Sequence, residues 1–142
     1  MKFIMMATAI ILGSASVVWA QADVVSQRTT ILKTFGAGAK DTGGMLRGEA
    51  PFDLAKVKAT LATIKAGAPQ LVSMFPDASL GGTTKALPLI GQERDKFAAI
   101  FTKLAADATA AETSITDEAT FKAEFGKVLG NCGACHRQYQ AK

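Results

Sequence analysis

Apolar residues recur at helical spacing in four stretches of the chain, and no useful length of it alternates apolar and polar residues as a β-strand does. Clusters of Gly, Pro, Ser or Thr separate these stretches. The predicted helices cover about residues 24–46, Asp53 to a stop at Gly67 and Pro69, about 89–112, and about 117–139. The pattern therefore predicts an all-α protein built from four helices.

The connections between the helices carry their own signals. Prolines and glycines make residues 68–88 a long connection, with room for one helical turn around Leu71 to Phe75. Ser114, followed three residues later by Asp117, predicts a capping box at the start of the last helix. Glycines in the first helix weaken it locally and permit close packing against a neighbour.

The last predicted helix carries its apolar stripe through both cysteines and the only histidine. The stripe consists of Phe121, Phe125, Val128, Leu129, Cys132, Cys135, His136 and Tyr139. Side chains three or four residues apart lie on one face of a helix. We therefore expect the cysteines and the histidine to face the core.

The N-terminus is built like an export signal. Lys2 precedes an apolar run from Phe3 to Leu12, and small residues follow. Cleavage fits after Ala20 or after Ala22, and Ala22 matches the small-x-small rule better. The run is shorter than the ~20 residues that a membrane span needs, which disfavours an uncleaved anchor. We expect a periplasmic mature protein without a membrane segment.

Removal of the signal peptide, residues 1–22, leaves residues 23–142, which is enough chain for one domain but not for two ordinary ones. With 49% hydrophobic and 20% charged residues the chain can bury a core, which excludes a disordered class. The formal charge of +4 comes without a dense Lys/Arg cluster, so the sequence gives no support to nucleic-acid binding.

The motif Cys132-Gly-Ala-Cys135-His136 is the chemical signal of the chain. Cysteines one helical turn apart can form thioethers with two vinyl groups on one edge of a porphyrin, and the adjacent imidazole can reach the iron. The motif therefore predicts one covalently attached haem c with His136 as the proximal iron ligand. Two alternatives are weaker. Zinc needs four ligands, and thiol–disulfide pairs with this spacing sit at a helix N-terminus beside a βαβ pattern.

The residues themselves do not decide which group, if any, occupies the second axial position of the iron. Once His136 serves as the proximal ligand no second histidine remains, because the chain has only one. Met45 and Met74 are the methionines of the mature chain, and neither is placed by spacing alone to face the iron. Each is a candidate sixth ligand or a core gap-filler.

Over essentially the whole mature chain, the sequence resembles the cytochromes c′, the class II c-type cytochromes. The segments that carry this resemblance are the C-terminal haem motif with Tyr139 beyond it, Arg28-Thr-Thr-Ile-Leu32-Lys33, Gly48-Glu-Ala-Pro-Phe-Asp53 and Phe75-Pro-Asp-Ala-Ser79. The haem motif alone is common to c-type cytochromes, whereas its C-terminal position together with the Arg28 segment is specific. The chain departs from the family at Gln70 and Gly91, near positions where tryptophan is frequent, and at Gln140, where a basic residue is common.

The resemblance implies an antiparallel up-down-up-down four-helix bundle with one covalently bound haem. It implies that Arg28 pairs with a haem propionate, that Leu32 covers the distal face of the iron, and that Tyr139 packs on the haem. Family members with Leu in place of Met at the position of Leu32 have a five-coordinate iron. The implied function is binding of NO or CO, electron transfer, or both, without enzymatic activity.

Two further expectations follow from the resemblance. The alternative function is that of a six-coordinate, methionine-ligated, low-spin electron carrier. The partners are small gases, an unidentified redox protein and, through the first two helices, a second copy of the chain as an antiparallel homodimer.

Overall fold

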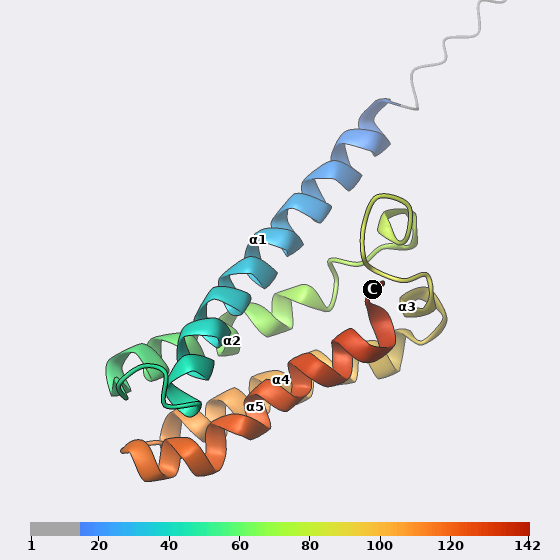
Figure 1. The fold of residues 1–142 in the computed structure, drawn as a ribbon. Coiled ribbons are helices and arrows are strands. Elements are labelled where there is room, and N and C mark those ends of the chain that lie inside the picture. The colour runs from blue at the N-terminus through green and yellow to red at the C-terminus, as the bar shows by residue number, and fades with distance from the viewer. Residues whose placement is uncertain (1–14) are drawn as a thin grey trace, which may run out of the picture.

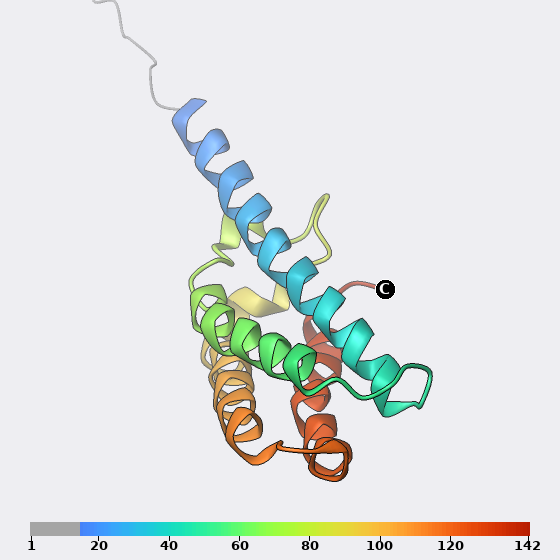
Figure 2. The same cartoon turned by 90° about the vertical axis from the view of Figure 1, so that its left-hand side faces the viewer.

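The computed structural model describes residues 15–142, with side chains from residue 22 onward, so the predicted signal peptide lies largely outside the described residues. The elements are α1 (Ala15–Leu46), α2 (Leu54–Leu71), the 3-10 turn η1 (Asp77–Ser79), α3 (Leu89–Gln92), α4 (Arg94–Ser114) and α5 (Glu118–Tyr139). Each long helix runs back along the one before it, and α4 and α5 lie side by side (Figures 1 and 2). The predicted all-α, up-down-up-down four-helix bundle is confirmed.

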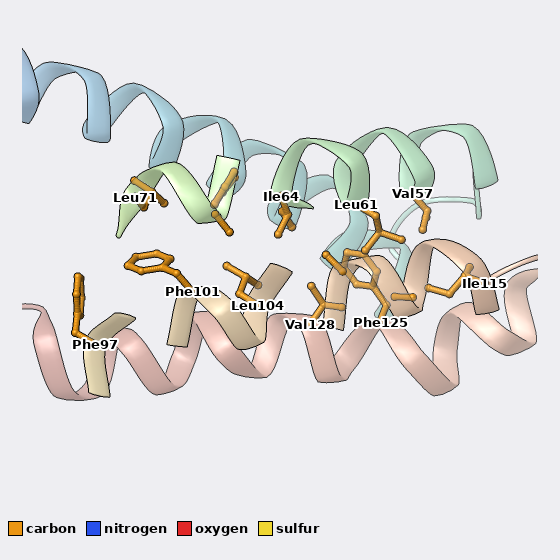
Figure 3. Close-up of a cluster of buried hydrophobic side chains, with 14 of the residues drawn as sticks. Val57, Leu61, Ile64, Leu71, Phe97, Phe101, Leu104, Ile115, Phe125 and Val128 are labelled. Carbon is orange, nitrogen blue, oxygen red and sulfur yellow. The ribbon is translucent and has the colours of Figure 1, made fainter. Parts of the chain in front are cut away.

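The core lies where α2 packs on α4 and α5 (Figure 3). Side chains from all three helices meet there, and those with 0 to 1% exposure include Val57, Leu61, Ile64, Leu71, Phe121, Phe125 and Val128. The rings of Phe121 and Phe125 on α5 have their centroids 5.1 Å apart, and Phe121 also lies 5.4 Å from the ring of Phe52, just before α2. None of the described helices is long and apolar enough to span a bilayer.

The helices α1 and α2 approach closely at two glycines. A Cβ on Gly38 would stand 2.8 Å from the Thr60 methyl carbon, and a Cβ on Gly67 would stand 2.8 Å from the ring of Phe35. Real Cβ contacts essentially never come this close, so any larger residue at either position would force Thr60 or Phe35 to move. The close packing that the glycines of the first helix suggest is therefore present at Gly38.

The predicted stop of the second helix at Gly67 and Pro69 is wrong, because α2 continues to Leu71. Its N-terminus agrees with the prediction, since the Asp53 carboxylate accepts a hydrogen bond from the Lys56 amide at 3.1 Å. Proline removes one intrahelical hydrogen bond, but Ala68 and Leu71 are both 0% exposed, and burying them offsets that loss.

Three other local predictions also differ from the structure. The third predicted helix is broken at Glu93, whose backbone leaves the helical region (φ −122°, ψ 41°) and separates α3 from α4. Ser114 is the last residue of α4 rather than a cap, and the capping box forms instead between Asp117 and Thr120, with bonds of 2.8 and 3.1 Å. The single helical turn of the long connection is η1, a few residues after the predicted place.

Candidate functional site

A cavity of about 610 Å³ opens between α1 and α5. It exists because α1 packs extensively on α2 but touches α5 at few places, which leaves the two helices apart. All six side chains that the sequence predicts for the haem site line this cavity, namely Arg28, Leu32, Cys132, Cys135, His136 and Tyr139. The fold thus brings together residues more than a hundred positions apart.

The cysteines and the histidine come from the C-terminal half of α5. Cys132 and Cys135 are partly buried, and His136 is exposed at the cavity. Desolvation raises the pKa of both thiols, that of Cys135 to about 11. Reactive disulfide-exchange cysteines need the opposite, a lowered pKa. Among the described residues, no group of three or more His, Cys, Asp or Glu side chains is placed to hold a metal ion.

Arg28 reaches the cavity from α1 and is only 3% exposed. Its guanidinium donates to the Ser79 hydroxyl at 2.7 Å, the Ser79 carbonyl at 2.8 Å and the Met74 carbonyl at 3.1 Å. It also lies 4.5 Å from the centre of the Phe75 ring. Burial lowers the pKa of Arg28.

All of these Arg28 partners are neutral. Within the described part of the chain, no carboxylate comes within ion-pair distance of the guanidinium. A buried cation without a counter-charge is unfavourable. An anionic group in the cavity, such as a haem propionate, is therefore what this arginine fits.

Leu32 stands one helical turn after Arg28 and points into the same cavity. It is 37% exposed, which is unusual for a large apolar side chain in this structure. Met45 and Met74 are not among the cavity-lining residues, since Met45 is 5% exposed in the core and Met74 packs against that core. No methionine of the described residues lines the cavity.

Tyr139 forms the end of the cavity and is 2% exposed. Its ring meets Phe97 edge to face at 5.1 Å, and its hydroxyl donates to the Glu93 carboxylate at 2.9 Å. Burial and the nearby Glu93 raise the pKa of Tyr139 to about 12. Tyr139 is therefore fixed at both ends of its side chain.

Comparison with known proteins agrees with this geometry. The family model described as Cytochrome C′ matches residues 23–140. This chain belongs to the cytochrome c′ family. Its predicted membership is confirmed.

Relatives within the cytochrome c′ family cover nearly the whole chain. A cytochrome c′ of Rhodopseudomonas palustris is 48% identical over 94% of this chain and 91% of its own length. A cytochrome c-556 of Agrobacterium fabrum is 34% identical over 83% of this chain and 81% of its own. The solved structure of a cytochrome c′ from Rhodopseudomonas palustris superposes with a TM-score of 0.80 at 49% identity, covering 84% and 97% of the two chains.

As a cytochrome c′, the chain carries a covalently bound c-type haem, and the predicted cofactor is confirmed. The residues of the cavity fit that group. The two cysteines stand one turn apart on α5, an imidazole adjoins them, and a buried arginine without a carboxylate partner lies in the same cavity. The roles of individual residues are taken up below as proposals.

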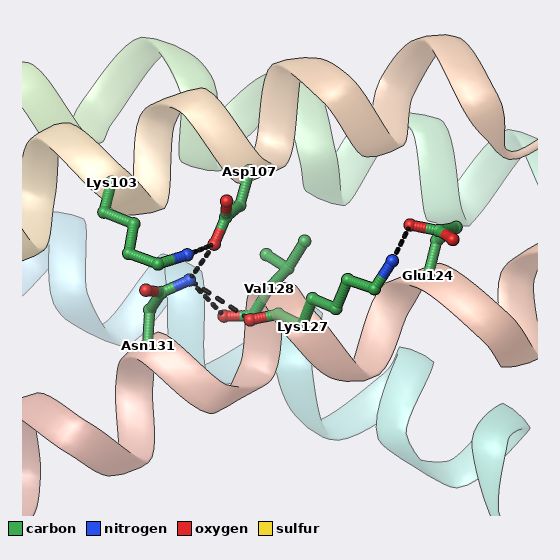
Figure 4. A network of polar contacts seen from close by, with 6 residues as sticks. All are labelled: Lys103, Asp107, Glu124, Lys127, Val128 and Asn131. Atoms are coloured by element: carbon green, nitrogen blue, oxygen red, sulfur yellow. Dashed lines mark hydrogen bonds and ion pairs between the residues drawn. The ribbon is translucent and has the colours of Figure 1, made fainter.

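A polar network lies beside the haem motif, and the sequence pattern did not predict it. The Asn131 amide is 7% exposed and donates to the Asp107 carboxylate at 2.7 Å, while Lys103 pairs with the same carboxylate (Figure 4). The Asn131 amide also donates to the carbonyls of Lys127 and Val128. This network joins α4 to α5 one residue before Cys132. Spacing alone gave no signal for it, because the predicted apolar stripe does not include Asn131, and its partner Asp107 lies on another helix.

The cavity lining outside α5 includes residues that sequence reasoning missed. The segment from Thr83 to Ala86 lines the cavity, and its backbone is tied to the end of α5. Leu87 donates to the Tyr139 carbonyl at 3.0 Å, and Ala141 donates to the Lys85 carbonyl at 2.8 Å. On α1, the stripe Val25, Thr29, Leu32, Gly36 and Ala39 also lines the cavity, and its helical spacing is a signal that could have identified it.

Proposed function

We propose that this cytochrome c′ is a periplasmic protein with a five-coordinate haem iron that binds small diatomic gases, NO or CO, and transfers electrons rather than catalysing a reaction. One observation carries the proposal. Leu32 of α1 lines the same cavity as His136 of α5, and no methionine of the described residues lines it. An iron held from the side of α5 would meet an apolar side chain, not a ligand, on the side of α1.

In this proposal each cavity residue has one role. Cys132 and Cys135 form the thioethers, and His136 is the proximal ligand. Arg28 has used three of its five N–H donors on Ser79 and Met74, and the remaining two would bind a propionate. Tyr139 packs on the haem. The bound haem supplies reversible gas binding at the iron and a one-electron change of oxidation state.

The chemistry of the α1 wall favours some gases over others. Leu32 has no hydrogen-bond donor, and the Thr29 hydroxyl nearby already donates to the Val25 carbonyl at 2.6 Å. Bound O₂ gains from a distal donor, whereas NO and CO depend on one far less. A ligand must also displace the Leu32 side chain, which imposes a steric cost on every gas.

A second candidate is a six-coordinate, low-spin electron carrier with Met45 or Met74 as the sixth ligand. This second candidate is supported by the relatives, because several of them are cytochromes c-556 that are 31 to 34% identical to this chain. In this structure, however, reaching the cavity would require Met45 to leave the core or Met74 to leave its packed position.

Ferrous spectra with and without CO separate the two candidates. We expect a high-spin wild type, faster and tighter CO binding in Leu32→Ala, and a low-spin spectrum in Leu32→Met. The matched control is Val72→Ala, because Val72 is equally exposed at 38% but does not line the cavity. A low-spin wild type whose CO affinity ignores Leu32 and rises when one methionine is replaced would establish the six-coordinate carrier instead.

His136 is tested by substitution. We expect His136→Ala to keep the thioether-bound haem, resistant to acid-acetone extraction, but to lose the spectrum of the wild-type iron. A spectrum unchanged by the substitution would remove His136 as the ligand.

Export and assembly belong to the same proposal. The family match begins at residue 23, directly after the predicted cleavage at Ala22, which supports a signal peptide of residues 1–22 and a mature domain of residues 23–142. We expect the purified protein to have the mass of the chain from Asp23 plus one haem. Sedimentation tests the homodimer, which a monomer mass at micromolar concentration would exclude.

A further inference from the structure

We propose that Lys33 and Lys85 are the residues that neutralise the two propionate carboxylates of the haem at the mouth of the cavity. The inference rests on the proposed placement of the haem between α1 and α5, and it adds two binding residues to that site.

The first observation is the charge of the cavity. Its charged lining consists of Arg28, Lys33 and Lys85, and His136 adds an imidazole. No Asp or Glu occurs among the described residues that line it. A haem brings two carboxylates into this space. An excess of cations without acids is the electrostatic complement of such a dianion.

The second observation is that these two lysines have no partner inside the protein. In the described part of the chain most lysines pair with a carboxylate, including Lys56, Lys65, Lys96, Lys103, Lys122 and Lys127. Neither Lys33 nor Lys85 forms an ion pair or a side-chain hydrogen bond with another described residue. Their ammonium groups are therefore free to meet an anion in the cavity.

The third observation concerns Arg28. Its guanidinium is held by Ser79 and Met74, which leaves it two N–H donors and a fixed position deep in the wall. One fixed arginine can serve one carboxylate edge, but it cannot neutralise two flexible propionates. A second carboxylate at the cavity would therefore meet the other cations of the lining, Lys33 and Lys85.

The two lysines come from separate segments of the cavity lining, α1 and the loop before α3. Lys33 follows Leu32 on α1, and both Lys33 and Lys85 are exposed residues that also line the cavity. The backbone of Lys85 is held in place, because its carbonyl accepts from Ala141 at 2.8 Å and Ala86 bridges to Gln140. Only the flexible stem of each lysine has to move to reach a carboxylate.

The experiment follows the propionates directly by carbon-13 NMR of the holoprotein, with the haem carboxyl carbons labelled. Lys33→Gln and Lys85→Gln should each increase the proton affinity of one propionate about three- to tenfold, because removing a cation near 4 Å raises a carboxyl pKa. The matched control is Lys40→Gln, an exposed lysine on the same helix that has no ion pair and does not line the cavity. It should leave both propionates unchanged.

A second readout is the midpoint potential. Loss of either cavity lysine should lower it, since removing a positive charge favours the oxidised iron, and added salt should shrink the difference. Lys40→Gln should not move it.

Arg28→Gln, which removes the buried charge just as the two lysine variants do, makes failure of this inference distinguishable from failure of the haem placement. If Arg28→Gln shifts a propionate titration while Lys33→Gln and Lys85→Gln do not, the two lysines are not propionate ligands and the placement stands. If none of the three variants shifts either propionate, both the inference and the placement are overturned.

Discussion

The α2–α4 side of the bundle and the α1–α5 side are built from similar helices but are filled in different ways. On the first side, Val57, Leu61 and Phe125 are 0% exposed and occupy the space between the helices (Figure 3). On the second side, Leu32 is 37% exposed and a cavity of about 610 Å³ remains. Protein interiors are normally close-packed. The α1–α5 side is therefore a site shaped for a prosthetic group and not a poorly packed core.

The division between the two sides runs across α5 itself. Its first half supplies phenylalanines to the core, and its second half supplies Cys132, Cys135 and His136 to the cavity. Asn131 lies at the boundary between the two halves, and its amide donates a hydrogen bond to Asp107 of α4 just before the first cysteine. One helix thus serves both as a structural member and as the carrier of the cofactor.

The largest expected loss of stability comes from a substitution on the packed side. We expect Phe125→Ala to lower the free energy of unfolding by about 3–5 kcal/mol, because it removes a fully buried ring and leaves a void. Leu32→Ala should cost less, because it removes a smaller side chain that the other helices do not enclose and that the haem alone would cover. Urea unfolding of both haem-bearing variants measures the difference. Equal losses at the two positions would contradict the division into a packed side and an open side.

Next in size is the Asn131–Asp107 pair at the boundary. Asn131→Asp removes the only donor to Asp107 from α5 and places two carboxylates together, so we expect a loss of about 1.5–3 kcal/mol. The double variant Asn131→Asp/Asp107→Asn restores a donor and an acceptor in exchanged positions. It should recover part of the loss in urea unfolding, because the donations to the Lys127 and Val128 carbonyls and the ion pair with Lys103 are still lost. A double variant less stable than Asn131→Asp would mean that the hydrogen bond does not hold α5.

The same two sides of the bundle show which parts of the structure could be predicted from the sequence. The packed side follows from spacing, because apolar residues three and four apart define helix faces whatever their neighbours are. The haem motif was equally readable, since Cys132, Cys135 and His136 lie within one short segment. What spacing could not show was the pairing of distant segments, such as Arg28 with Ser79 or Lys85 with Ala141.

The errors at helix ends have the same origin. Pro69 ends a helix by local rules, but burial of Leu71 carries α2 past it. Glu93 looks like ordinary helix interior, yet its carboxylate accepts hydrogen bonds from Tyr139 and Gln138 of α5 where the helix breaks. In both places tertiary contacts decide the local structure, and a single sequence does not contain those contacts.

A smaller effect is expected at the far end of the cavity. Tyr139→Phe keeps the ring against Phe97 but loses the hydrogen bond to Glu93, so we expect a cost of about 1 kcal/mol. Glu93 is not left unsatisfied, because Lys96 and Gln138 still donate to it at 2.7 Å. Thermal unfolding measures the change. A loss as large as that of Phe125→Ala would show that the hydroxyl, and not the ring, is the main contribution of Tyr139.

The smallest expected effect is the contribution of Asp107 to acid stability. Lys103 and Asn131 lower the pKa of this carboxyl. A carboxyl whose pKa is lower in the folded than in the unfolded chain contributes stability above its unfolded value, about 3.9, and that contribution disappears as the pH falls through the folded value. Asp107→Asn should therefore reduce stability at neutral pH and flatten the loss of stability below about pH 4. Because Asp107 is partly solvated and its ion pair is screened, the flattening should be modest.

The control is Asp41→Asn, an exposed carboxyl without an ion pair among the described residues, which should leave the acid limb of the urea-unfolding profile as in wild type. If Asp107→Asn and wild type lose stability in parallel between pH 5 and pH 2, the polar link between α4 and α5 does not depend on the charge of Asp107.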